Sequence, residues 1–212
     1  MKATIVFDNT TTRADLQPDW GFACVVELAG RKILFDTGAN GAILLENMKQ
    51  LNIDPNSIND VFISHNHFDH IGGLAEFLNV NRDVYLFLPP SLRGVRNAEE
   101  ITYLEKPTRI AEGVYSTGEL QGIEQAMSVE TGKGLVLFVG CSHPRMELIL
   151  HAAKQFGKLY GIIGGLHGFN QYELFAGLKL ICPTHCTQHK AELKKKYPDQ
   201  YLEGGVGRVI NI

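Results

Sequence analysis

Four potential metal ligands lie within six consecutive residues of this chain, His65-Asn66-His67-Phe68-Asp69-His70. The stretch before them, Asp60-Val61-Phe62-Ile63, has the length of a short buried strand and is apolar after its first residue. Because alternate side chains of an extended segment share a face, His65 and His67 are predicted to bind one cation. A turn or helix start after them would bring Asp69 and His70 to a second cation. Imidazole and carboxylate ligands suit zinc, iron and manganese, so the stretch predicts a loop of ligands for two metal ions.

Strand-like and helix-like segments alternate on both sides of this loop. Before it, Ala29-Gly30-Arg31 separates two apolar runs and predicts a hairpin, and residues 42–51 have the apolar period of a helix. After it, a second helix is predicted beyond Gly72-Gly73, followed by a strand at 84–88. Residues 91–118 have no clear period, and we predict an irregular segment there.

The second half of the chain repeats the order of strands followed by helices. Strands are predicted at 125–130, 135–139, 159–163, 180–182 and 206–210, and helices at 144–156 and 187–197. If the strands form two sheets that pack on each other, helices can cover only the outer face of each sheet. We therefore expect an α/β fold in which residues 1–212 form a single domain, a helix-sheet-sheet-helix sandwich. A single doubly wound sheet is the competing architecture.

The composition excludes several classes of protein. With 212 residues, of which 44% are hydrophobic and 20% charged, the chain is an ordinary globular protein. A net charge of −3 predicts no nucleic-acid partner and no attraction to an anionic membrane. No apolar run reaches the roughly 18 residues of a membrane helix, and the first residues lack a signal-peptide pattern, so a cytoplasmic location is expected. The cysteines are then expected to be free thiols, with Cys24 and Cys182 packed in apolar runs.

The H-x-H-x-D-H pattern after a strand resembles the signature of the metallo-β-lactamase superfamily. Residues 65–70 match it without a gap, and Leu34-Phe35-Asp36-Thr37-Gly38 matches the hairpin that usually precedes it. The resemblance implies the metallo-β-lactamase fold, a four-layer αββα sandwich, and a site for two metal ions. It also implies that Asp36 supports the site by contacting the ligands. The alternative for Asp36 is a simple turn residue before Gly38.

The strand predicted at 135–139 leads into Gly140-Cys141-Ser142-His143, where the superfamily usually has an aspartate in place of Cys141. Cys141 is therefore either a thiolate ligand or a packing residue. His143 is predicted to bind a metal, with helix capping or support of other ligands as the alternative. The middle-loop histidine of the superfamily is missing, because no histidine lies between His70 and His143. Either His143 or Glu124 would replace it.

Two more histidines follow later strands. His185, in Ile181-Cys182-Pro183-Thr184-His185, matches the last superfamily motif and is a predicted ligand, with Cys186 as a packing neighbour. His167 could bind substrate, transfer a proton or be a plain loop residue. The predicted metal ligands are His65, His67, Asp69, His70, His143 and His185, with Cys141 as a further candidate. The predicted catalytic residues are Asp69 and His167.

Together these motifs resemble one branch of the superfamily, whose members are metal-dependent hydrolases or archaeal dihydropterin ribofuranosyl-aminobenzene phosphate synthases. The resemblance implies two divalent metal ions, with zinc favoured over iron or manganese. The implied activity is hydrolysis of an ester or phosphoester of a small molecule by a metal-activated hydroxide. Asp69 would orient the attacking water, and His143 or His167 would protonate the leaving group.

Other functions use the same residues differently. A synthase or transferase acting on a phosphorylated pterin-type precursor would need an anion site, for which Arg93, Arg96 and Arg109 are available. A redox or oxygen-sensing role is disfavoured, because diiron proteins of this fold usually contain a flavin domain. A purely structural zinc site is disfavoured, because its ligands would form a closed and compact set. A small-molecule substrate is the only partner that the sequence predicts, and the oligomeric state stays open.

Overall fold

The computed structural model describes residues 1–212. The chain forms two sheets, and the first has seven strands. These are β1 (Lys2–Phe7), β2 (Ala23–Leu28), β3 (Arg31–Phe35), β4 (Asp60–Phe62), β5 (Tyr85–Leu88), β6 (Glu100–Tyr103) and β13 (Val209–Asn211). Their order is β13-β1-β2-β3-β4-β5-β6, antiparallel from β13 to β3 and parallel from β3 to β6. The predicted β2–β3 hairpin turns at Ala29 and Gly30, which both have positive φ.

The second sheet has six strands from the later part of the chain. These are β7 (Thr108–Ala111), β8 (Val114–Ser116), β9 (Met127–Thr131), β10 (Gly134–Val139), β11 (Leu159–Gly165) and β12 (Leu180–Thr184), in the order β12-β11-β10-β9-β8-β7. Strands β10, β11 and β12 are parallel. Their carboxyl ends therefore meet at one edge of the sheet.

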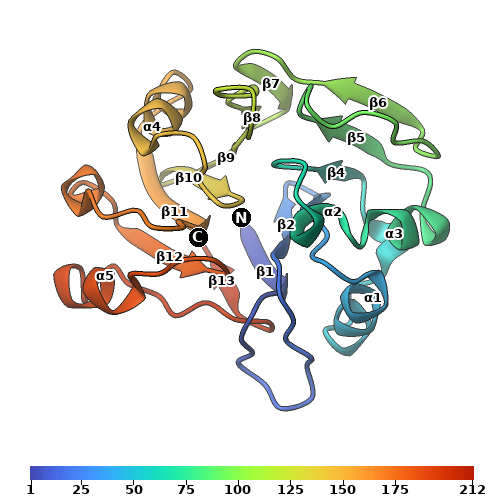
Figure 1. The fold of residues 1–212 in the computed structure, drawn as a ribbon, viewed down its shortest axis with the longest axis horizontal. Helices are drawn as coiled ribbons and strands as arrows, with labels where there is room; N and C mark the ends of the chain where they lie inside the picture. The colour runs from blue at the N-terminus through green and yellow to red at the C-terminus, as the bar shows by residue number, and fades with distance from the viewer.

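Helices cover the outer face of each sheet (Figure 1). They are α1 (Gly41–Gln50), α2 (Phe68–Ile71), α3 (Leu74–Val80), α4 (Met146–Lys154) and α5 (Lys190–Lys196), with short 3₁₀ turns η1 (Pro55–Ser57) and η2 (Tyr172–Phe175). None of these helices is long and apolar enough to cross a membrane.

Three hydrophobic clusters separate the layers. The central cluster joins the two sheets, with Phe35 stacked on Phe62 and tilted against Phe138 of the opposite sheet. A second cluster packs α1 and α3 on the first sheet, and a third packs α4 and α5 on the second sheet. The structure confirms the four-layer αββα sandwich of the metallo-β-lactamase fold, and the alternative of one doubly wound sheet is wrong.

The prediction that residues 91–118 form an irregular segment is wrong in part, because they contain β6, β7 and β8. β6 and β7 lie at the edges of their sheets, and their side chains are half-buried or exposed. Such strands lack the strong apolar alternation by which buried strands are predicted. The final strand is also displaced from the predicted 206–210 to Val209–Asn211, and Val206 makes only an isolated bridge to Thr11.

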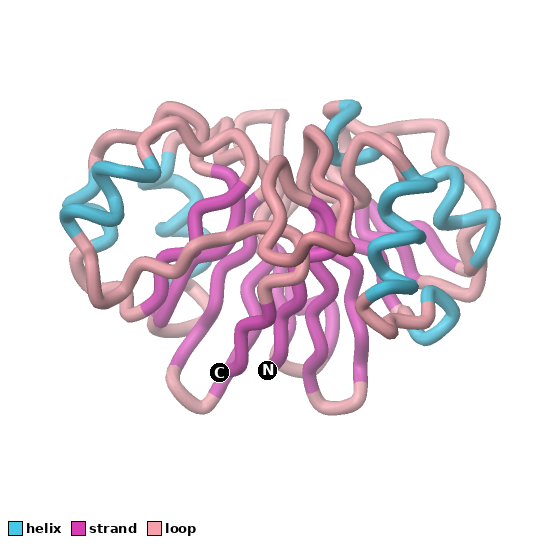
Figure 2. The backbone as a smooth tube through the Cα atoms, turned by 90° about the horizontal axis from the view of Figure 1, so that it is seen from below, coloured by secondary structure: helices cyan, strands magenta, loops and turns pink.

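The long loops lie at one edge of the sandwich and the two termini at the other (Figure 2). The amino group of Met1 donates a hydrogen bond of 2.8 Å to the carbonyl oxygen of Ile212 at the terminal edge. The ends of β1, β4, β10, β11 and β12 lead into the loops at the opposite edge. All the predicted site residues lie in these loops or at their borders.

Candidate metal centre

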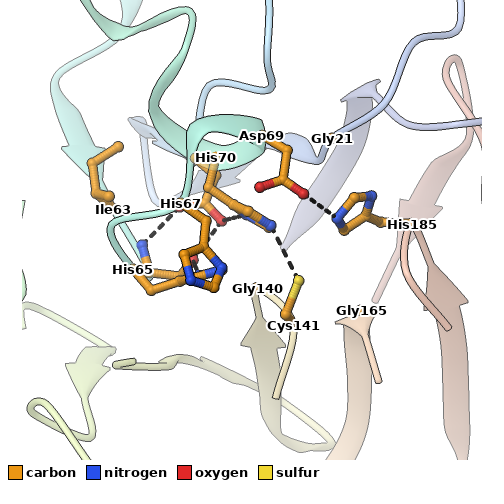
Figure 3. Close-up of polar contacts among 12 residues, drawn as sticks. Gly21, Ile63, His65, His67, Asp69, His70, Gly140, Cys141, Gly165 and His185 are labelled. Atoms are coloured by element: carbon orange, nitrogen blue, oxygen red, sulfur yellow. Dashed lines mark hydrogen bonds and ion pairs between the residues drawn. The ribbon is translucent and has the colours of Figure 1, made fainter. Parts of the chain in front are cut away.

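The loop after β4 positions the first four candidate ligands (Figure 3). β4 ends at Phe62, and α2 begins at Phe68 with His67 as its N-cap residue. His65 and His67 point into the same space, with Nε2 of His65 3.1 Å from Nδ1 of His67. Asp69 and His70 belong to α2, which turns them toward the opposite side of the site. The loop thus has the strand-then-helix geometry that its motif predicts.

Three histidines surround one candidate cation position, namely His65, His67 and His143. Their ring centroids are 4.6 to 4.8 Å apart, and one nitrogen from each lies within 4.8 Å of the others. Nε2 of His143 is buried and has no hydrogen-bond partner. A buried polar atom without a partner costs about 1–3 kcal/mol. A metal ion would supply the missing partner, so this set of residues fits a cation.

A second candidate position lies among Asp69, His70 and His185. Oδ2 of Asp69 is 3.1 Å from Nε2 of His185, and one donor atom from each of the three lies within 4.8 Å of the others. Nε2 of His70 is also 3.2 Å from Sγ of Cys141. Because the ring centroids of His65 and His70 are only 4.2 Å apart, the two positions are adjacent.

Hydrogen bonds from residues outside the two donor sets orient the candidate ligands. Asp36 is fully buried, and its Oδ2 lies 2.7 Å from Nδ1 of His70. The backbone N–H and the hydroxyl of Ser64 also donate to this carboxylate, each at 2.7 Å. On the far side, Oδ1 of Asn9 lies 2.9 Å from Nδ1 of His185. Each anchored Nδ1 leaves the Nε2 of the same ring to face the site, which fixes the ring for metal binding.

Glu124 holds the loop that contains Cys141 and His143. Its Oε1 accepts hydrogen bonds of 3.0 to 3.1 Å from the N–H groups of Gly140, Cys141 and Ser142, and its Oε2 accepts one of 2.9 Å from His143. Burial raises the pKa of Glu124 to about 7 even though these donors lower it. The loop N–H groups occupy both oxygens of Glu124, whereas the ring of His143 lies against that of His65.

Burial favours the neutral form of three candidate ligands, His65, His70 and His143. Desolvation lowers the pKa of His143 to about 4, and lowers the pKa values of His65 and His70 below their ordinary range, with further lowering by neighbouring histidines. Desolvation would raise the pKa of Asp69, but hydrogen bonding to His185 and nearby imidazoles outweigh it and lower that pKa. Neutral imidazoles and an ionised carboxylate are the protonation states that metal binding requires.

Left-handed backbone conformations are concentrated at the site. Asp36, Ser142, His167 and His185 have φ values of 56°, 60°, 44° and 44°. These residues follow β3, β10, β11 and β12, and each turns the chain sharply at a strand end. Such conformations cost roughly 1–3 kcal/mol for a non-glycine residue and are concentrated at functional sites. The strained turns direct side chains from both sheets toward one region.

Two thiols lie beside the second cation position. Cys141 is buried and Cys186 is partly exposed, both are free, and their Sγ atoms are 3.2 Å apart. The hydrogen bond between them raises the pKa of Cys141, which burial raises further, and lowers the pKa of Cys186 to about 6. By contrast, Cys24 and Cys182 belong to the central hydrophobic cluster, as predicted, and burial raises the pKa of Cys182 to about 12.

His167 lies beside the three-histidine position. Its ring centroid is 4.9 Å from that of His143, and its side chain is exposed. Both histidines line a cavity of about 290 Å³, together with residues 144–146 and 168–171. Arg145, an exposed cationic residue, also lines this cavity. A group that can transfer a proton and a group that can bind an anion therefore lie next to the candidate metal positions.

The loop between β1 and β2 also contributes to the site, although no motif in the sequence predicts it. The indole nitrogen of Trp20 donates a hydrogen bond of 2.9 Å to Oδ2 of Asp69, and its ring centroid is 4.9 Å from that of His185. Asp8 is buried beneath the site and accepts a hydrogen bond from the N–H of His185. The available signals were the single tryptophan of the chain and the Asp8-Asn9 pair directly after an apolar strand.

The three arginines considered as anion ligands are not brought together. Arg93 and Arg96 line a separate cavity of about 450 Å³ beside α3, and the guanidinium of Arg93 lies 4.2 Å from the ring centroid of Tyr103. Arg109 lies on β7 in the other sheet, where its Nε donates to the carbonyl oxygen of Ala111. The cavity beside α3 therefore contains two of the three arginines, and the cavity beside His143 contains none of them.

Known proteins resemble the chain over most of its length. Residues 20–115 match the model of the metallo-beta-lactamase superfamily. A 7,8-dihydropterin-6-methyl-4-(beta-D-ribofuranosyl)-aminobenzene-5'-phosphate synthase of Methanocaldococcus jannaschii is 28% identical over 85% of this chain and 84% of the relative.

Solved structures also share the fold. A metal-dependent hydrolase of the beta-lactamase superfamily superposes with a TM-score of 0.80 and 23% identity, over 100% of this chain and 99% of the other. The metallo-beta-lactamase fold protein YhfI from Bacillus subtilis superposes with a TM-score of 0.71 and 15% identity, over 99% and 98% of the two chains.

Proposed function

We propose, from the premise that the chain contains a metallo-β-lactamase superfamily domain, that it is a metal-dependent hydrolase of an ester or phosphoester small molecule. Two divalent cations, with zinc favoured, are the proposed cofactors. The observation that carries the proposal is the convergence of two adjacent sets of donor atoms at the loop edge of the sandwich. The unpartnered Nε2 of His143 adds weight, because a cation would satisfy it.

The donor sets divide between two cations. His65, His67 and His143 would hold the first, and Asp69, His70 and His185 would hold the second, with Cys141 as a further ligand. Bound cations supply a water molecule of lowered pKa and positive charge to stabilise negative charge on the reacting centre.

The side chains around the cations have separate tasks. Asp69 is fixed by contacts with Trp20 and His185, so its carboxylate can orient a reacting water molecule. His167 borders the cavity beside His143 and is free to give a proton to the leaving group. Arg145 would hold an anionic part of the substrate in the same cavity, which favours a phosphoester.

Residues 1–212 are proposed to act as one domain on a small molecule. The central cluster takes side chains from both sheets, so neither half has a complete core alone. The cavity of about 290 Å³ beside His143 suits a small ligand.

The decisive experiment compares His67→Ala with His151→Ala. His67 faces the first position, whereas His151 lies on the exposed face of α4. Each purified variant is stripped with a chelator, reloaded with zinc, analysed for metal content and assayed on aryl esters, lactams and phosphodiesters. We expect His67→Ala to bind about one zinc fewer and to be roughly 100-fold or more less active. His151→Ala should keep the metal content and the activity of the wild type. Full metal content and full activity in His67→Ala would falsify the proposal.

A synthase activity is the second candidate, favoured by the 28% identity to the archaeal synthase. The same cations would then bind a phosphorylated pterin-type precursor and activate a nucleophile other than water. The protein is incubated with a pterin diphosphate in the presence and absence of an arylamine acceptor, and the products are separated by mass. A condensed product supports the synthase, and hydrolysis alone supports the hydrolase.

A further inference from the structure

We propose that Cys186 is a metal ligand and that it joins Cys141 as a pair of thiolates on the second cation. The inference rests on the proposed function, because it assumes a cation among Asp69, His70 and His185. It changes the expected ligand set of that position from one containing a single sulfur atom, that of Cys141, to one containing two. It also replaces the prediction that Cys186 is only a packing neighbour.

The sulfur atoms of Cys141 and Cys186 both lie beside the second candidate cation position. Sγ of Cys141 lies 3.2 Å from Nε2 of His70 and 3.2 Å from Sγ of Cys186. Donor atoms of Cys141, His185 and Cys186 all lie within 4.8 Å of one another. His185 thus belongs to two sets of donors, one with Asp69 and His70 and one with the two cysteines. A single cation can contact members of both sets.

The strand order explains how two distant cysteines meet. Cys141 follows β10 and Cys186 follows β12, and β11 lies between these strands in the sheet. β11 ends at Gly165, where a Cβ atom would lie 2.8 Å from Sγ of Cys186 and 3.3 Å from Cα of Cys141. Any side chain at this position would push into the space that the thiol of Cys186 occupies. Gly165 therefore leaves open the gap through which the two thiols meet.

The surroundings of Cys186 differ from those of the packing cysteines. Cys24 and Cys182 lie in the central cluster with almost no exposure. Cys186 is partly exposed at the loop edge, directly after His185, which Asp8 and Asn9 hold in place. A ligand must be anchored yet reachable by a metal ion, and this thiol meets both conditions. Thiolates are soft ligands and favour zinc or iron over magnesium and manganese.

The test uses cobalt(II) as a spectroscopic probe, because cobalt bound by thiolate absorbs in the near ultraviolet in proportion to the number of sulfur ligands. The wild type, Cys141→Ala, Cys186→Ala, the double variant and Cys182→Ala are stripped, loaded with cobalt and measured for absorbance and metal content. Cys182→Ala is the matched control, since it removes a buried thiol away from the site. We expect each single variant at the site to lose about half of the band, the double variant to lose all of it, and the control to keep it.

An undiminished band in Cys186→Ala, with cobalt still bound, overturns the inference and leaves the proposed function intact. A wild type that binds no cobalt and no zinc overturns the proposed function instead. X-ray absorption of the zinc-loaded wild type tests the inference without any substitution. With two zinc ions bound, two thiolates give about one sulfur per zinc on average, and Cys141 alone gives about half that value.

Discussion

Trp20 and Asp69 are joined by a hydrogen bond of 2.9 Å from the indole nitrogen to Oδ2, the carboxylate oxygen that also lies 3.1 Å from Nε2 of His185. The indole ring is 57% exposed, so this aromatic residue is held at the mouth of the candidate metal centre. The bond restricts the rotation of this half-buried carboxylate, together with its contact with His185. Trp20 therefore positions Asp69 from a loop that no sequence motif identified.

Replacing Trp20 by phenylalanine tests this role. The variant keeps an aromatic ring but loses the donor, so we expect zinc to bind about fivefold to tenfold more weakly, as for the loss of a hydrogen bond worth about 1 kcal/mol. Zinc affinity is measured by competition with a chromophoric chelator. Equal affinity in both proteins would show that Asp69 needs no help from the indole. Because Trp20 is the only tryptophan, its fluorescence in the wild type should also change when zinc binds.

Glu124→Gln should destabilise the loop that contains Cys141 and His143. An amide has only one accepting oxygen, so its NH₂ group would face at least one of the N–H groups that Glu124 now accepts. We expect a loss of about 1–3 kcal/mol in the free energy of unfolding of the metal-free protein, measured with urea. Glu130→Gln, which alters only an exposed contact with Tyr115, should change it by less than about 0.5 kcal/mol. Similar losses in the two variants would contradict the role assigned to Glu124.

Asp36→Asn should weaken metal binding although Asp36 is not itself a candidate metal ligand. Asp36 accepts hydrogen bonds from Ser64 and lies 2.7 Å from Nδ1 of His70, and an amide cannot satisfy all of these contacts. The ring of His70 then loses its fixed tautomer, and we expect zinc affinity to fall about 10- to 100-fold. Asp54→Asn is the control, because asparagine caps the exposed turn η1 as well as aspartate does. An unchanged affinity in Asp36→Asn would mean that His70 is oriented by its packing alone.

The buried histidines of the metal-free centre should contribute less to stability as the pH falls from about 6.5 toward about 4. The pKa of His143 is lowered from 6.5 to about 4, and those of His65 and His70 are lowered in the same direction. Between these values the unfolded chain binds protons at these histidines that the folded chain does not, so their contribution to the free energy of unfolding rises with pH across this window. Glu124, whose pKa is raised to about 7, contributes in the opposite direction and is the same in all the proteins compared. Urea unfolding at several pH values measures the pH dependence. His143→Gln should reduce the pH dependence and the exposed His151→Gln should not; equal slopes in all three proteins would refute the explanation.

The layered fold was predictable because buried strands leave local signals. The apolar run before His65 and the hairpin at Ala29-Gly30 are visible within a few residues of sequence. The edge strands β6 and β7 were missed, because half-exposed strands lack an apolar alternation. Their pairing depends on neighbouring strands that local sequence does not reveal.

The candidate metal centre was likewise predictable only in part. The candidate ligands of the 65–70 motif are close in sequence, so their spacing alone indicates them. The partners of His185 lie far away along the chain, at Asp8, Asn9 and Cys141. No periodicity links such residues, and only the folded sheets bring them together. For that reason the contacts of Trp20 and Asn9 with the site, and the arrangement of the two thiols, came only from the structure.

The hydrogen bond from the N–H of His185 to Asp8 joins residues 177 positions apart. During synthesis on the ribosome, the end of β1 is made early, and the loop that must pair with it is made 177 residues later. The second cation position therefore cannot form on a nascent chain of shorter length, whatever metal the cell supplies. A prematurely terminated product would retain the 65–70 motif but not the complete centre. Completion of the second candidate position thus requires that synthesis has passed this point and that both ends of the fold have met.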